Sequence, residues 1–362
     1  MKVPPAQPVM TETMIEAAAT ALRNERLTLG DSVFKFEEAF AKMCGVDHAI
    51  AVNSGTAALT LSLQALGVKA GDKVLTTAMS FVATTNSYVI FGANPVFADV
   101  READYTIDPA KLRLDKDTKA VIPVHLYGNP AQMDEINEAA RKHGAFVVED
   151  ACQAHGAMYK HKRAGALGHV GCFSFYPTKN MHVGGDGGMI TTNDAKIADL
   201  TKRLRHCGRK GQYEHDIIGH TARLNTANAA IGIEQLKMLP TWNEKRRAAA
   251  KQYDSLLKGV GDVIIPPGVT KDIEPVYHLY CIRTKRRDEL RKFLDSKGVG
   301  VGVHYEIPIH LQPAYRDIYG FKEGLLPITE RLSKEVLTLP MFADITSEQI
   351  KYVAECVREF YG

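Results

Sequence analysis

The chain has 362 residues, of which 45% are hydrophobic and 24% charged, and its formal net charge is +3. This length predicts a large domain with a smaller one, and a small net charge without a long basic block excludes most nucleic-acid-binding proteins. The sequence has no apolar signal core and no apolar run of about 20 residues, so we expect a cytoplasmic protein without membrane contact.

The six cysteines are widely spaced, and none forms a Cys-x-x-Cys pair. This pattern argues against a disulfide framework or a structural zinc site and indicates reduced thiols. The histidines show no metal-ligand spacing either. We therefore expect no metal centre in this chain.

Strand and helix patterns alternate along the first half of the chain. We expect strands at 48–52, 72–78, 94–100, 119–127 and 145–151, and helices at 56–66, 80–93 and 134–144. Short β-branched runs separated by helices are typical of a parallel α/β sheet. Ligands of such sheets bind outside the carboxyl ends of the strands.

The pattern changes over 224–257, a long helical stretch that we expect to be interrupted at Pro240. It leads to strand patterns at 276–284 and 301–307 with a helix between them. These elements predict a large domain over 12–240 and a smaller C-terminal α/β domain over 241–362. Residues 1–11 are a segment that could pack against the smaller domain.

The segment "NSGTAAL" (53–59) follows a predicted strand and opens a predicted helix. Small residues at a helix N-terminus let backbone N–H groups approach an anion. Gly55, Thr56 and Ala57 are therefore candidates to bind a phosphate group. The alternative is an ordinary tight turn between a strand and a helix.

Two further segments carry charged side chains in unusual positions. Asp150 ends a hydrophobic strand pattern in "VVEDACQAHGA", where it is either a helix N-cap or a functional acid. Lys179 lies in "FSFYPTKN", between an aromatic segment and the glycine-rich "GGDGG". This lysine is either a loop residue paired with an acid or a buried, nucleophilic amine, since desolvation lowers the pKa of lysine.

A phosphate cradle, a reactive lysine and an acid together match pyridoxal 5'-phosphate (PLP). The lysine binds the aldehyde carbon, and the carboxylate keeps the pyridine nitrogen protonated. An aromatic ring stacked on the cofactor completes such a site. Phe81 in "MSFVATT" is the candidate for that ring.

The chain resembles the DegT/StrS-type sugar aminotransferases, a branch of the fold-type-I PLP enzymes. The motifs that carry the resemblance, in order, are "NSGTAAL", "VHLYGNPAQM", "EDACQAHGA", "FSFYPTKN", "GGDGG", "RLNTANAAIG" and "HYEIPIHLQPAY". The resemblance implies a mostly parallel seven-stranded sheet flanked by helices, with a smaller C-terminal α/β domain. It also implies a homodimer with shared active sites.

The resemblance implies a role for each matching residue. Lys179 would hold PLP as a Schiff base, Asp150 would pair with the pyridine nitrogen, and Gln153 would bind the ring hydroxyl. Gly55, Thr56 and Ser174 would bind the phosphate, and Phe81 would stack on the ring. His304 and Tyr305 would line the sugar-nucleotide pocket, while His182 and Asp186 would face the acceptor.

One departure from the family pattern lies in "GHTARL" (219–224). Where the family usually has an asparagine that reaches the partner's cofactor phosphate, this chain has Thr221. Arg223 of the same motif is retained and is a candidate for substrate binding. The hydroxyl of Thr221 is shorter than an asparagine side chain, so its contact with phosphate is an open question.

The implied reaction moves an amino group from an amino acid, L-glutamate, to a keto sugar linked to a nucleoside diphosphate, with pyridoxamine phosphate as the intermediate form of the cofactor. Asp186 in "GGDGG" resembles the members that aminate C3. The alternatives are amination at C4, amination of a cyclitol or other non-nucleotide ketone, a PLP-dependent sugar dehydratase and a non-catalytic regulatory protein. Lys179 argues against the dehydratase, because dehydratases resembling this family have histidine there.

Overall fold

The computed structural model describes all 362 residues as an elongated α/β molecule. Its main sheet has seven strands in the order β1-β9-β8-β5-β4-β2-β3. The strands are β1 (His48–Val52), β2 (Lys73–Thr77), β3 (Asn94–Ala98), β4 (Thr118–Ile122), β5 (Phe146–Asp150), β8 (Val170–Ser174) and β9 (Gly188–Thr192). Four of the six strand pairs are parallel, and β9 pairs antiparallel with both β8 and β1. This mostly parallel seven-stranded sheet confirms the predicted fold class.

Helices cover both faces of the sheet because its strands are apolar on both sides. Along β5, Val147 packs toward α5, whereas Val148 belongs to the cluster that contains α3. Six of the helices are α1 (Glu12–Asn24), α2 (Asp31–Cys44), α3 (Gly55–Ala65), α4 (Ala83–Val89), α5 (Met133–His143) and α6 (Ala195–Arg205). The resulting layers place the carboxyl end of β5 and the N-terminus of α3 near each other, as the site below shows.

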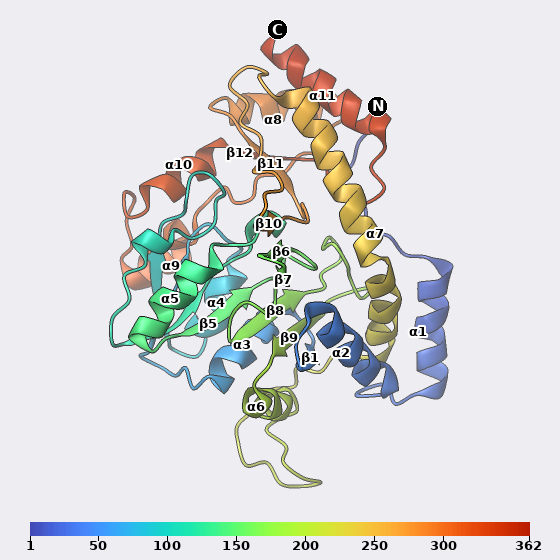
Figure 1. Ribbon diagram of the computed structural model, residues 1–362, viewed down its shortest axis with the longest axis vertical. Helices are drawn as coiled ribbons and strands as arrows, with labels where there is room; N and C mark the ends of the chain where they lie inside the picture. Colours follow the sequence, from blue (N-terminus) through green and yellow to red (C-terminus); the bar gives the residue numbers. More distant parts are fainter.

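Helix α7 (Thr226–Leu257) runs without interruption through Pro240, so the predicted break is wrong. It extends from α1 and α2 beside the main sheet to α11 at the other end of the molecule (Figure 1). Buried residues on either side of the proline, Leu239 and Trp242, pack against the body. The burial of these side chains compensates for the backbone hydrogen bond that the proline removes, so the helix continues.

The C-terminal part contains the two-stranded antiparallel sheet of β11 (Tyr280–Arg283) and β12 (Val336–Leu339). Its helices are α8 (Arg287–Ser296), α9 (Pro313–Tyr319), α10 (Pro327–Glu335) and α11 (Ser347–Tyr361). The strand predicted at 301–307 is absent, since this segment makes only a single bridge, between Gly302 and Thr338. Val3 near the N-terminus is buried and bridges Val299. The division of the chain at residue 240 stays a prediction.

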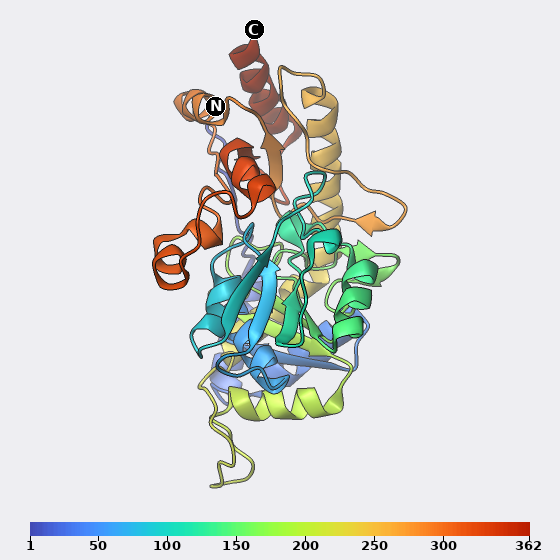
Figure 2. The ribbon, with the colours of Figure 1, turned by 90° about the vertical axis from the view of Figure 1, so that its left-hand side faces the viewer.

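Short elements complete the fold. They are the three-stranded sheet of β6 (Met158–Tyr159), β7 (Lys162–Arg163) and β10 (Ile273–Glu274), and the 3-10 turns η1 (Pro109–Lys111), η2 (Leu126–Gly128) and η3 (Ile309–Leu311). After α6, residues 206–223, which we call the arm, form a loop whose tip extends away from the body in both views of the ribbon (Figures 1 and 2). The end of the arm returns to the body, where Ala222 is buried and Arg223 bridges Val52 of β1. Tyr213 and Ile218 within it are 85% and 97% exposed.

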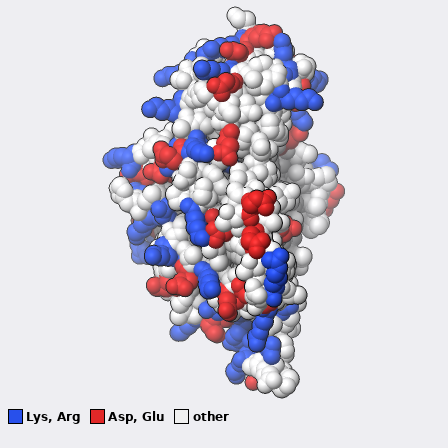
Figure 3. All heavy atoms as spheres, turned by 90° about the vertical axis from the view of Figure 1, so that its right-hand side faces the viewer, with Lys and Arg blue, Asp and Glu red and all other residues white.

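The surface shows charges of both signs interspersed over the face drawn in Figure 3, in keeping with the small net charge. No helix of the structure combines the length and the apolar character needed to cross a bilayer.

Candidate active site

A cavity of about 550 Å³ opens beside the ends of β5 and β8 and the start of α3. Ten of the residues singled out in the sequence line it: Gly55, Thr56, Phe81, Asp150, Gln153, Ser174, Lys179, Asp186, His304 and Tyr305. They come from segments up to 250 positions apart. The strand order brings together those that follow strands of the main sheet, and the C-terminal part of the chain adds His304 and Tyr305. The cavity is therefore the candidate active site.

Lys179 ends a turn that follows β8, with its backbone N–H donating to the carbonyl of Tyr176 at 2.9 Å. Burial lowers the pKa of its ammonium, although the nearby Cys152 and Asp150 act in the opposite direction. No salt bridge to Lys179 forms, so the interpretation as an acid-paired loop lysine is wrong. Lys179 is thus a partly buried amine with a lowered pKa, which is the form of lysine that acts as a nucleophile.

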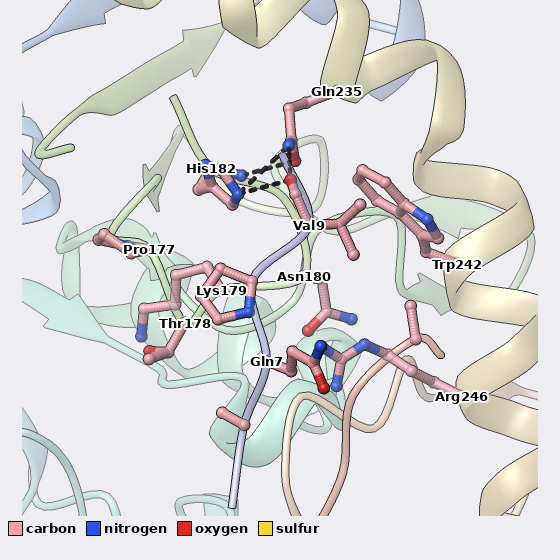
Figure 4. Close-up of a pocket in the computed structure, with 13 residues that line it drawn as sticks. Gln7, Val9, Pro177, Thr178, Lys179, Asn180, His182, Gln235, Trp242 and Arg246 are labelled. Atoms are coloured by element: carbon pink, nitrogen blue, oxygen red, sulfur yellow. Dashed lines mark hydrogen bonds between the residues drawn. The ribbon is translucent and has the colours of Figure 1, made fainter. Parts of the chain in front are cut away.

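The neighbouring Asn180 fixes the turn. Its side-chain amide donates to the carbonyl of Val276 and to Oδ1 of Asn243, both at 2.9 Å. Arg246 of α7 in turn donates to the carbonyls of Tyr277 and His278. Figure 4 shows Asn180 and Arg246 beside Lys179, with the N-terminal segment passing in front of them. The lysine thus stands on a turn tied directly to residues 276–278.

Asp150 is the last residue of β5 and is 5% exposed. Its Oδ2 accepts a hydrogen bond from Oγ1 of Thr84 at 2.7 Å, and its Oδ1 accepts one from the backbone N–H of Cys152 at 3.2 Å. No helix begins after β5, so the alternative of a helix N-cap is wrong. The carboxylate instead faces the cavity that Lys179 lines.

The start of α3 offers free backbone donors to the cavity. Ser54 is the N-cap and accepts from the N–H of Ala57 at 3.0 Å, which leaves the first-turn amides of Gly55 and Thr56 without an intrahelical acceptor. A Cβ added at Gly55 would lie 2.7 Å from Cβ of Ser174. Only glycine therefore permits this close approach of the helix to the Ser174 hydroxyl.

Four residues singled out in the sequence lie outside the cavity of this chain. Ala57 uses its amide in the cap and packs against the α3 core. His182 is directed away from the cavity, toward Val9 and Gln235, as the dashed lines in Figure 4 show. Thr221 contacts Cys207, and Arg223 contacts His206.

Other cavity residues have no sequence signal that we recognised. Ser80 and Thr84 line the wall beside Asp150, and His278 lies on the wall near Lys179. Nδ1 of His278 is buried without a hydrogen-bond partner. These residues lie within ordinary helix and strand patterns of the sequence, so only the tertiary structure brings them to the site.

The half-buried His304 makes the stability of the folded chain sensitive to acid. Burial first, and the Lys179 charge second, lower the pKa of His304 from 6.5 to about 4. Between those two values the unfolded chain binds more protons, so the free energy of unfolding falls as the pH falls. We expect urea unfolding of the protein without added ligand to show this loss between pH 6.5 and 4. His304→Asn should lessen the loss by the share of one titrating group, because the pKa values of the buried His155 and His278 are also lowered and act in the same direction. An unchanged pH dependence in His304→Asn would contradict the lowered pKa.

The donor set around the cavity fits PLP. One cavity of about 550 Å³ is lined by all the groups that PLP needs. They are an amine for the aldehyde, a carboxylate for the ring nitrogen, and two free amides with a hydroxyl for the phosphate. Gln153 is also suitably arranged, since its Oε1 accepts from the N–H of Tyr127 while its Nε2 donates only one bond, to Tyr305. One N–H of Gln153 therefore stays available to a ring hydroxyl.

Comparisons with known proteins agree with this chemistry. The family model "DegT/DnrJ/EryC1/StrS aminotransferase family" matches residues 8–358. A pleiotropic regulatory protein of Geobacillus stearothermophilus is 43% identical over 94% of this chain and 92% of its own length. A dTDP-3-amino-3,4,6-trideoxy-alpha-D-glucose transaminase of Streptomyces venezuelae is 40% identical over 95% of this chain and 91% of its own.

Among solved structures, S. venezuelae DesV in complex with a ketimine intermediate superposes with a TM-score of 0.93 at 40% identity, over 96% of this chain and 94% of that one. These findings confirm the predicted family, fold, enzyme class and cofactor. The chain belongs to the DegT/DnrJ/EryC1/StrS aminotransferase family and is a PLP-dependent aminotransferase.

Proposed function

We propose that the enzyme transfers the amino group of L-glutamate to C3 of a keto sugar carried by a nucleoside diphosphate. The observation that carries this proposal is the shared cavity of Lys179 and Asp150, which gives the chain an intact aminotransferase site. The acceptor class rests on the S. venezuelae relative, whose name specifies a nucleotide-linked 3-amino sugar. Asp186, exposed at the cavity, is a candidate contact for that acceptor.

The cofactor would lie between the lysine turn and the start of α3. The free amides of Gly55 and Thr56 and the Ser174 hydroxyl would bind its phosphate, helped by the positive end of the helix dipole. Phe81, 57% exposed and 6.2 Å from the Tyr305 ring, would stack on the pyridine. Asp150 would hold the proton at the pyridine nitrogen.

PLP, when bound, supplies an electron sink for the bond that breaks at the substrate carbon. Lys179 would hold the cofactor through its Nζ, and the released amine would lie beside the substrate carbon. Because burial lowers the pKa of this amine, Nζ could take and return the proton of the donor's Cα. The same amine serves the reverse sequence with the keto acceptor.

A second copy of the chain would complete the site. The arm (206–223) projects from the body and carries exposed apolar side chains, which a monomer leaves in water. Thr221 and Arg223 lie outside their own chain's cavity. We therefore propose a homodimer in which the arm of one copy brings Thr221 and Arg223 to the phosphate and substrate of the other.

The test is a donor–acceptor screen of the PLP-loaded enzyme, read by the mass shift of the product. We expect L-glutamate to convert nucleotide-linked 3-keto sugars, with 4-keto sugars and free cyclitol ketones unreactive. Reaction with cyclitol ketones alone would refute the nucleotide-sugar acceptor, and reaction at C4 alone would refute the position. Lys179→Ala is the control for non-enzymatic amination.

A further inference from the structure

A row of buried hydroxyl groups runs from the cavity wall to Asp150. Oγ of Ser80, in the turn after β2, lies 2.7 Å from Oγ1 of Thr84 in the first turn of α4. Oγ1 of Thr84 lies 2.7 Å from Oδ2 of Asp150. The three residues are 4%, 1% and 5% exposed, and all of them line the cavity.

The chemistry of the groups fixes the direction of this row. An ionised carboxylate only accepts hydrogen bonds, so Thr84 must give its single hydroxyl proton to Asp150. With its only proton given to Asp150, the Thr84 oxygen can take part in a second hydrogen bond only as the acceptor. The Ser80 hydroxyl must therefore be the donor of the bond between Ser80 and Thr84. Every proton in the row therefore points toward the carboxylate, and each bond strengthens the next.

The other carboxylate oxygen is held from a different side. Oδ1 of Asp150 accepts from the backbone N–H of Cys152 at 3.2 Å. Two donors on different oxygens leave the carboxylate one orientation about its Cβ–Cγ bond, because rotation would break both hydrogen bonds. Hydrogen bonds to a charged group are the stronger kind, so this restraint is substantial.

We propose that Thr84, supported by Ser80, is a positioning residue that holds the Asp150 carboxylate toward the ring nitrogen of the cofactor. The inference rests on the role of Asp150 in the proposed function, and it adds two residues that act only through that carboxylate. In this proposal Thr84 acts through its hydrogen bond to the carboxylate alone. Its effect must therefore depend on the presence of a ring nitrogen.

The next residue of α4 provides a matched control. Thr85 is fully buried like Thr84, but its hydroxyl has no hydrogen-bond partner. Threonine and valine have nearly the same shape, so Thr84→Val and Thr85→Val remove one hydroxyl each from neighbouring positions of the same helix. Only the first of them breaks a bond to Asp150. Thr84→Ser keeps the hydroxyl and should restore the wild-type behaviour.

The experiment measures the affinity of the apoenzyme for PLP and for its 1-deaza analogue, in which the ring nitrogen is a C–H group. We expect the wild type to prefer PLP, and Thr84→Val to reduce that preference by about tenfold while leaving the analogue's affinity unchanged. Thr84→Ser and Thr85→Val should keep the preference. Ser80→Ala should reduce it less than Thr84→Val, because Thr84 still donates to Asp150.

The outcomes separate this inference from the one on which it rests. If Asp150→Asn loses the preference for PLP but Thr84→Val keeps it, the positioning role is overturned while the role of Asp150 stands. An equal loss of affinity for both ligands in Thr84→Val also overturns it, because the effect would then not pass through the ring nitrogen. If neither the wild type nor Asp150→Asn distinguishes the two ligands, both assignments fail together.

Discussion

Lys179→Ala should lower the rate of transamination by about 10⁴-fold or more. The variant loses both the amine that holds the cofactor and the base that moves the proton, and no other primary amine lines the cavity. The rate of the donor half-reaction is measured as the loss of the cofactor's visible absorbance after mixing with L-glutamate in a single turnover. Added methylamine should recover part of the lost rate, because a small free amine can enter the space that the side chain leaves.

The variant should still bind PLP, since the amides of α3 and the Ser174 hydroxyl are unchanged. Gel filtration followed by an absorbance spectrum separates bound from free cofactor. Lys196→Ala is the matched control, because Lys196 is exposed on α6, remote from the cavity lining. Turnover of Lys179→Ala at the wild-type rate would refute the assignment of this lysine.

Asp150→Asn should lower the single-turnover rate by about 10²-fold or more. The substitution keeps the shape of the side chain but removes a buried negative charge that would face a cationic ring, a loss of about 3 kcal/mol or more. The same absorbance measurement with L-glutamate gives the rate. A cofactor analogue methylated on its ring nitrogen carries a permanent positive charge and should recover part of the rate.

Asp199→Asn serves as the control for removing an aspartate charge, since Asp199 lies exposed on α6 with only a 3.8 Å pairing to Arg203. If Asp150→Asn and Asp199→Asn had equal rates, the carboxylate would have no part in activating the cofactor. A loss of cofactor binding without a loss of rate at saturating PLP would limit Asp150 to affinity alone.

Much of the fold could be predicted because local patterns and tertiary structure agree in the first half of the chain. Alternating apolar runs and helices ended by Gly67 and Gly144 predicted β1 to β5 and the helices α3, α4 and α5, whereas the full seven-stranded sheet was implied only by the family resemblance. The rule that ligands bind outside the carboxyl ends of parallel strands also predicted the side of the sheet on which Asp150 and the start of α3 line the cavity. Both predictions depend on short-range patterns that the packed structure does not override.

The errors lie where packing overrides local preference. Pro240 is a strong local signal for a helix end, yet contacts on both sides of it carry α7 through. Residues 301–307 alternate like a strand, but only Gly302 finds a bridge partner there. His182 lies three positions from Lys179, and its hydrogen bonds to Val9 and Gln235 direct it away from the cavity.

Hydroxyl residues such as Ser80 and Thr84 escape sequence reasoning for another reason. Serine and threonine are common in turns and first helical turns, so their presence there carries no specific signal. Their role appears only when the ends of β2 and β5, which lie on either side of β4 in the sheet, are brought to the same edge. The same holds for His278, which reaches the cavity from the C-terminal part of the chain.

The attachment of Asn180 to Val276 restricts how the enzyme can open. Asn180, next to Lys179, is hydrogen-bonded to Val276, two positions before His278. The turn that carries Lys179 and the segment that carries His278 must therefore move together. Substrate entry that separated them would break buried hydrogen bonds at each turnover. The aromatic rings of Phe81 and Tyr176, both more than half exposed at the cavity, are free of such ties. We therefore expect the part of the cavity wall that carries Lys179 and His278 to keep its shape, while the cavity is open to solvent beside these two rings.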